Sequence, residues 1–160
     1  MVAAGWLMLG SAATSAACCL TPRAEATPRA QANAIGMLTV MVLAATVPSP
    51  FVHRAGALVL LTLGAGVGYG LVGAGTTQPR AVEGHRAAGS VLTAAALLLH
   101  EHMEGSTVVV LQAATIAYAA WTLVAVIRTH TWMTTRLRWE HLAMATSLGA
   151  MVFAMNHLAL

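Results

Sequence analysis

Charged side chains are scarce in this 160-residue chain, and lysine and aspartate are absent altogether. Charged residues make up 8% of the sequence, about a third of the roughly 25% that is usual for a soluble domain. Hydrophobic residues make up 58%, and the mean hydropathy is +0.75. So few charged side chains cannot hydrate the whole surface of a folded chain. Most of that surface must therefore face something other than water. The composition predicts an integral membrane protein whose main partner is the lipid bilayer.

The net positive charge does not indicate a nucleic-acid-binding protein. All eight basic residues are arginine, and they are scattered between apolar runs. No basic stripe with interleaved aromatic residues occurs, as a nucleic-acid surface would need, so we expect no nucleic-acid partner. An excess of Ala, Val, Gly and Arg without Lys is typical of a high-GC bacterium. The expected location is therefore the bacterial cytoplasmic (inner) membrane, as a multi-pass protein.

Six apolar segments can be compared with the roughly 20 residues that a helix needs to cross a bilayer. These segments are 2–20, 33–47, 55–74, 86–102, 107–127 and 141–160. Polar connections rich in Thr-Pro, Pro-Ser-Pro and Gln-Pro separate them, as is typical of loops. The sequence predicts an all-α fold, a single polytopic transmembrane bundle over residues 1–160 with about six spans. The second and fourth segments are short, so five spans with one re-entrant piece is the alternative.

The arginines predict the orientation of this bundle. With six spans, Arg54 stands alone in the loops of one side, and the other side holds Arg23, Arg29, Arg80, Arg86, Arg128, Arg136 and Arg138. Because arginine gathers in cytoplasmic loops, both termini are expected outside. Residues 1–10 have no basic residue before their apolar run, so we expect a retained first helix and not a secretory signal.

Glycines are spaced closely in the third segment. The stretch from Gly68 to Gly73 matches G-x-G-x-x-G, but a dinucleotide site needs a strand before it and a helix opening after it. Gly64, Gly66, Gly68 and Gly70 instead form two overlapping G-x-x-x-G pairs, which let helices approach closely in lipid. We expect the stretch from Gly64 to Gly70 to form a helix contact, either within the chain or with other membrane-protein subunits.

Metal-ligating side chains gather in the fourth connection, which reads His-Glu-His-Met-Glu. Imidazole suits copper and zinc, thioether suits Cu(I), and carboxylate broadens the choice. The sequence predicts a copper or other transition-metal site at the outer face, formed by His53, His100, Glu101, His102, Met103, Glu104 and His157. The alternatives are a solvated polar loop, because H-x-H spacing is common, and a proton-handling role. A haem between His100 and His157 is a further alternative.

The last segment carries a second candidate site. At about 100° per residue, four side chains fall within roughly an 80° arc of a helix, namely His141, Met144, Met151 and Met155. On the second segment Asn33, Met37 and Met41 also share a face. Facing thioethers predict a ladder of sites for a soft ion. The alternative is packing, since methionine fills gaps between helices.

The two cysteines and the missing catalytic motifs limit the function classes. Cys18 and Cys19 are adjacent near the expected cytoplasmic end of the first helix, where we expect buried small apolar residues or a soft metal site. No nucleophile elbow, nucleophile–base pair or phosphate loop occurs, so we expect no enzyme. Ionisable groups in membrane spans mark ion pathways, and the expected spans hold almost none at their centres. This argues against an ion pump.

The chain resembles a family of small, uncharacterised polytopic proteins of actinobacteria. The resemblance rests on Ala17-Cys18-Cys19, on Asn33 to Met41 followed by Pro48, and on His141-Leu142-Ala143-Met144 running to Met151 and Met155. It implies a recurring His-x-x-Met pattern in which Asn33 replaces the earlier histidine, and it implies no known activity. We expect a non-enzymatic accessory or assembly protein that handles copper at its outer face. The alternatives are a subunit packed into a larger membrane complex, and a small transporter or membrane enzyme.

Overall fold

The described part of the chain is helical throughout. The computed structural model describes residues 2–21, 27–47, 49–69, 80–99, 105–128 and 134–156, and these form six α-helices and no strand. The helices are α1 (Val2–Leu20), α2 (Pro28–Thr46), α3 (Pro50–Tyr69), α4 (Arg80–Leu99), α5 (Gly105–Arg128) and α6 (Thr135–Asn156). The prediction of an all-α fold is confirmed. The two segments that are short in the sequence belong to continuous helices of 19 and 20 residues.

Several helices begin earlier than the apolar segments do, because polar residues form their first turns. Thr27 caps α2 by accepting a hydrogen bond from the backbone nitrogen of Ala30 at 3.2 Å, and Pro28 follows it. Thr134 accepts a hydrogen bond from the backbone nitrogen of Leu137 at 3.3 Å, just before α6. Charged residues assigned to loops on hydropathy therefore lie inside helices.

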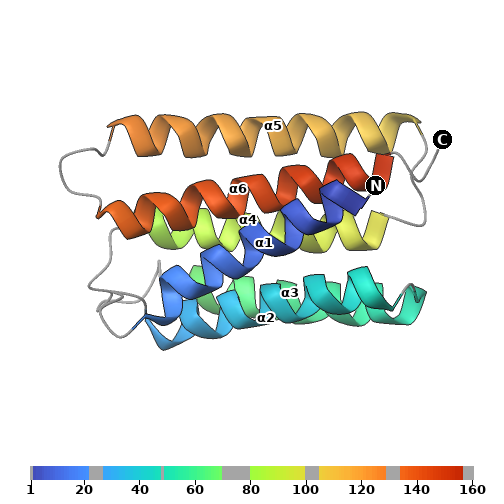
Figure 1. Cartoon of the computed structure of the whole chain (residues 1–160), viewed down its shortest axis with the longest axis horizontal. Helices are drawn as coiled ribbons and strands as arrows, with labels where there is room; N and C mark the ends of the chain where they lie inside the picture. Colours follow the sequence, from blue (N-terminus) through green and yellow to red (C-terminus); the bar gives the residue numbers. More distant parts are fainter. Residues whose placement is uncertain are drawn as a thin grey trace.

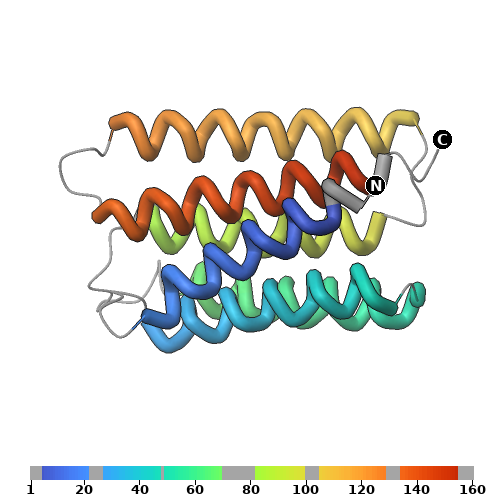
Figure 2. Tube along the Cα trace, in the orientation of Figure 1, coloured from blue at the N-terminus to red at the C-terminus, as the bar shows by residue number. Residues whose placement is uncertain are grey.

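The six helices follow one long axis and alternate in direction along the chain (Figure 1; Figure 2). Helix α6 packs against both α1 and α5, whereas α3 packs against α2 and α4. Helices α1, α3 and α5 end where α2, α4 and α6 begin, at one end of the bundle. We call this the arginine-rich end, because it holds Arg29, Arg128, Arg136 and Arg138.

The bundle is apolar outside and partly polar inside. Large apolar side chains are exposed on every helix, for example Trp6, Ile35, Phe51, Val91, Ile116 and Phe153. Arg86 and Glu83 are both only 2% exposed. Among the described helices, α3 and α5 are long and apolar enough to cross a membrane. The buried charges of α4 and the polar first turns of α6 lower the hydropathy of those two helices.

Small polar side chains connect the helices inside the bundle. The Ser90 hydroxyl lies 2.8 Å from Asn33 Oδ1, which joins α4 to α2. The Ser147 hydroxyl lies 3.0 Å from the carbonyl oxygen of Met8 and 3.1 Å from Met41 Sδ, so that α6 is joined to α1 and α2. Such buried hydrogen bonds help to decide which faces of neighbouring helices meet.

The glycines of α3 contact a helix of the same chain. A Cβ atom at Gly64 would lie 3.1 Å from the Cβ of Ser90 on α4, which shows how closely the two helices approach. Gly66 faces open space, and Gly70 lies outside the described residues. The helix contact that the glycine spacing predicts is thus found between α3 and α4.

We predict that Gly56→Ala destabilises the bundle by about 1–3 kcal/mol, because overpacking costs energy of this order. A Cβ at Gly56 would lie 2.7 Å from Cγ1 of Val40, a stiff and buried side chain. Gly66→Ala is the control, since nothing lies within 4 Å of its added Cβ. Thermal unfolding in detergent measures both, and equal midpoints for the two variants would contradict the packing.

Candidate functional site

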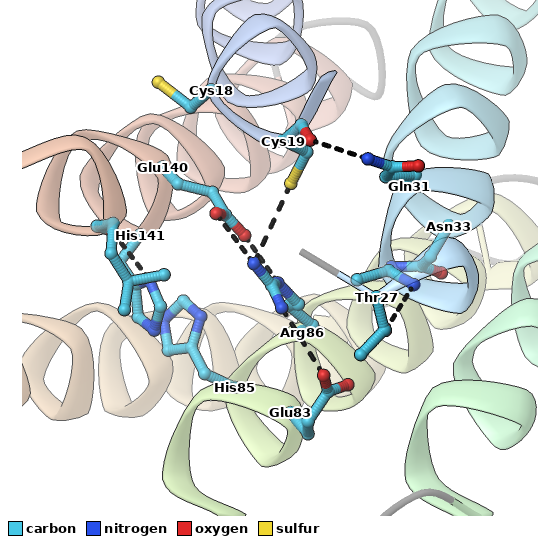
Figure 3. Close-up of polar contacts among 12 residues, drawn as sticks. Cys18, Cys19, Thr27, Gln31, Asn33, Glu83, His85, Arg86, Glu140 and His141 are labelled. Carbon is cyan, nitrogen blue, oxygen red and sulfur yellow. Dashed lines mark hydrogen bonds and ion pairs between the residues drawn. The ribbon is translucent and has the colours of Figure 1, made fainter. Parts of the chain in front are cut away.

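A buried ion pair joins α4 to α6 near the arginine-rich end of the bundle (Figure 3). Arg86 Nε donates to Glu140 Oε1 at 2.6 Å, and Arg86 Nη2 donates to Glu140 Oε2 at 2.9 Å. Two parallel bonds of this kind are charge-assisted and about twice as strong as bonds between neutral groups. Because both side chains are buried, the pair fixes the rotation and depth of α4 against α6.

A second carboxylate lies on another side of Arg86. Glu83, one turn earlier on α4, places Oε1 at 3.5 Å from Arg86 Nη1. This oxygen is buried, and no hydrogen-bond donor among the described residues reaches it. A side-chain hydrogen bond joins the Glu83 carboxyl group to Thr27, the N-cap of α2. The cluster therefore holds two carboxyl groups for one guanidinium group.

The end of α1 adds a thiol to this cluster. Cys19 is buried, and its Sγ lies 4.0 Å from Arg86 Nη2. The neighbouring Cys18 is half-buried, and its sulfur points away from Arg86 (Figure 3). Both cysteines are free. Burial and the nearby Glu140 carboxylate favour the neutral thiol of Cys19, and the Arg86 guanidinium group opposes them only in part.

A small cavity lies beside the ion pair, between α1, α2, α4 and α6. Its volume is about 20 Å³, enough for one water molecule or one metal ion. Sulfur-containing side chains, polar side chains and three alanines surround it. The lining includes Cys19, Asn33, Met37, Glu140, Met144 and Ser147.

Hydrogen bonds from His85 tie α4 to α5. The Thr122 hydroxyl donates its single proton to the carbonyl oxygen of Tyr118 at 2.8 Å. His85 Nε2, 2.7 Å from that hydroxyl oxygen, must therefore be the donor in their contact. In the neutral ring Nδ1 is then the acceptor, and the Tyr118 hydroxyl lies 3.1 Å from it. These partners assign the tautomer of His85 with hydrogen on Nε2.

His141 has the opposite tautomer and stacks on His85. Its Nδ1 donates to the carbonyl oxygen of Leu137 at 2.8 Å, which leaves Nε2 of the neutral ring unprotonated. The two imidazole rings lie with their centroids 4.0 Å apart and their planes inclined by 27°. The stack brings two further ionisable side chains into the same region of the bundle.

The predicted outer metal cluster falls mostly outside the described residues. This applies to His100, Glu101, His102, Met103, Glu104 and His157. His53 is buried in the first turn of α3, at the end of the bundle opposite Arg86. Within the described ranges, no three His, Cys, Asp or Glu side chains are grouped as a metal ion would require.

The predicted stripe on α6 faces the interior, where its members have different surroundings. His141 stacks on His85, Met144 lines the cavity, and Met151 belongs to the hydrophobic core. The side chain of Met155 lies outside the described part. On α2, Asn33 and Met37 also line the cavity.

Buried ionisable groups occur near the starts of two described helices, away from the helix centres to which the prediction of empty spans refers. Glu83, His85, Arg86 and Glu140 are all buried within α4 or α6. Hydropathy assigned Arg86 to a loop because its neighbours are polar. The spacing of Glu83 and Arg86 by three residues is the signal that could have placed both on one helical face.

Comparison of the chain with protein-family models, with curated proteins and with solved structures finds no match. The resemblance to small polytopic proteins of actinobacteria therefore stays a prediction. The case for a function depends on the chemistry of the site itself.

We predict that Arg86→Gln lowers the free energy of unfolding by about 3–5 kcal/mol, since removal of one partner leaves a buried charge uncompensated. Arg128→Gln is the control, because Arg128 is exposed at the same end of the bundle, and its effect should stay within about 0.5 kcal/mol. Denaturant unfolding in detergent, followed by circular dichroism, compares the two. Equal losses of stability would show that the ion pair does not organise the bundle.

Proposed function

We propose that this chain is a multi-pass protein of the bacterial inner membrane, with six spans and both termini outside. Its role is non-enzymatic, as an accessory or assembly protein that binds a soft metal ion, Cu(I), inside the bundle. The observation that carries the proposal is the cavity where Cys19, Met37 and Met144 meet beside the Arg86–Glu140 pair.

The apolar exterior supports a membrane location for the whole bundle. Phe51 is 79% exposed and Ile116 is 69% exposed, whereas Glu83 and Arg86 of α4 are buried. In water this distribution would leave large apolar patches open to aggregation, and in lipid it is the stable one. The arginines at one end agree with a cytoplasmic face there.

Single-cysteine labelling tests this topology. In a background with Cys18 and Cys19 replaced by alanine, Arg54→Cys and Arg128→Cys place thiols at opposite ends of the bundle. We expect a membrane-impermeant maleimide to label Arg54→Cys in intact cells, and Arg128→Cys only after lysis. Labelling of both positions from outside would contradict six spans with this orientation.

The chemistry of the cavity favours a soft ion. Thiolate and thioether sulfur are the ligands that Cu(I) prefers, and here they come from α1, α2 and α6. Three helices brought together by the fold can supply a trigonal site that no single helix could. Cys19 is a neutral thiol in the metal-free bundle and loses its proton when the ion binds, as a cysteine ligand does, with Arg86 4.0 Å from its Sγ.

We expect purified protein to bind Cu(I) stoichiometrically under reducing, anaerobic conditions, as measured by metal analysis and by competition with a chromogenic Cu(I) chelator. Cys19→Ser should abolish this binding, because it removes the only thiolate in the cavity lining. Met144→Leu should weaken it by removing a thioether.

Matched controls lie on the same two helices. Cys18→Ser and Met151→Leu remove sulfur from residues that do not line the cavity, so both should bind like wild type. Absence of Cu(I) from wild-type protein, or equal binding by Cys19→Ser and Cys18→Ser, would remove the metal proposal.

The alternative role, a subunit joined to a larger membrane complex through the glycines of α3, has weaker support. Gly64 packs against α4 of the same chain. Of the described glycines between 64 and 70, Gly66 is the one that faces open space and could contact another subunit. Native mass spectrometry from nanodiscs distinguishes the roles, since an obligate subunit would not be recovered as a lone chain. A small transporter is the third alternative, and the buried ionisable groups favour it over an enzyme.

A further inference from the structure

The buried cluster of Glu83, Arg86 and Glu140 at the arginine-rich end holds more acidic than basic groups. Glu83 and Glu140 are two acids, and Arg86 is the one guanidinium group that contacts both. All three side chains are at most 4% exposed. With both acids ionised, the cluster would carry a net negative charge away from water, which is costly unless a further cation or a proton neutralises it.

Geometry identifies which acid is in excess. Glu140 engages Arg86 through both oxygens, at 2.6 Å and 2.9 Å. Glu83 Oε1 is 3.5 Å from Arg86 Nη1, beyond the length of a charge-assisted hydrogen bond, and it is without a hydrogen-bond donor within the described ranges. Arg86 thus neutralises Glu140, and the charge of Glu83 is left over.

Of the charged groups described around Glu83 besides Arg86, Arg29 of α2 favours the ionised form, and its effect is the smallest of those on Glu83 because its side chain is exposed to solvent. From α2 the Thr27 hydroxyl group is neutral, and Arg29 is exposed with its guanidinium group 5.9 Å from the centre of the Tyr69 ring of α3.

The remaining elements offer neutral or distant groups. The neutral groups are Cys19 of α1, His85 of α4 stacked on His141 of α6, and Tyr118 of α5 bonded to His85. The cations are the exposed Arg128 of α5, Arg136 and Arg138 of α6, neither of which is among the charges that act on Glu83, and Arg54, which lies with His53 on α3 at the opposite end.

We propose that Glu83 is a proton-binding site of the bundle, protonated at Oε1 while Arg86 is paired with Glu140. When Arg86 moves from Glu140 toward Glu83, Glu83 ionises and the proton passes to Glu140, which is then the acid in excess. No bond other than the O–H bond is broken, and no oxidant or reductant is needed. The site goes beyond metal binding, because it gives the bundle one buried proton that its two acids can exchange.

Infrared spectroscopy of the full chain tests this proposal directly. A protonated carboxylic acid absorbs as a C=O stretch that shifts in D₂O, and ether-linked lipids remove the overlapping ester bands of ordinary phospholipid. We expect one such band in metal-free wild-type protein at neutral pH. Glu83→Gln keeps the shape of the side chain and leaves Arg86 and Glu140 as a neutral pair. This variant should lose the band and remain folded.

The charge count of the cluster makes a second prediction. Glu140→Gln leaves Arg86 to pair with Glu83, so Glu83 should ionise and the band should vanish here too. Absence of the band from wild type, its persistence in Glu83→Gln, or its persistence in Glu140→Gln would each overturn the proposal. No metal is present in these measurements, so their result is independent of whether the cavity binds Cu(I).

Discussion

The bidentate contact between Arg86 and Glu140 is the constraint on which the interior of this bundle depends. A buried charge without a partner would cost several kcal/mol, so only helix arrangements that bring the two side chains together are allowed. The contact joins α4 to α6 at one depth and one rotation. Once these two helices are in register, His85 and His141 stack, and the end of α1 brings Cys19 to the guanidinium group.

Weaker polar contacts select the packing of the other helices in the same way as the ion pair does for α4 and α6. Where the surface is apolar all round, burial of apolar groups gives little preference for one helix face over another. Ser90 and Ser147 supply that preference, because each hydroxyl group contacts polar or sulfur atoms of a neighbouring helix. Gly64 adds a close approach of α3 to α4. Fold and candidate site are therefore made by the same few polar residues.

Arg86 stands between two chemically different features. On one side is the cavity lined by Cys19 and Met144, and on another is Glu83, whose buried Oε1 accepts no hydrogen bond from the described residues. A single guanidinium group thus contacts a thiol, a paired acid and an acid in excess. Metal binding in the cavity and protonation of Glu83 would each change the electrostatic field that Arg86 experiences. Arg86 would therefore couple metal binding to the protonation of Glu83.

The sequence by itself determined that the chain is helical, roughly where each helix lies, and that His141, Met144 and Met151 share one face of the last helix. These are local properties, because hydropathy and the helical repeat connect residues a few positions apart. Helix starts were misplaced where polar first turns at Pro28, Thr135 and Arg80 lowered the hydropathy.

Only the tertiary structure decided that Arg86 meets Glu140, that His85 meets Thr122, and that Cys19 shares a cavity with Met144. The first two pairs are separated by 54 and 37 residues in the chain. No periodicity in the sequence specifies which helices become neighbours. That choice follows from the packing of all six helices together and from the cost of leaving any buried charge without a partner.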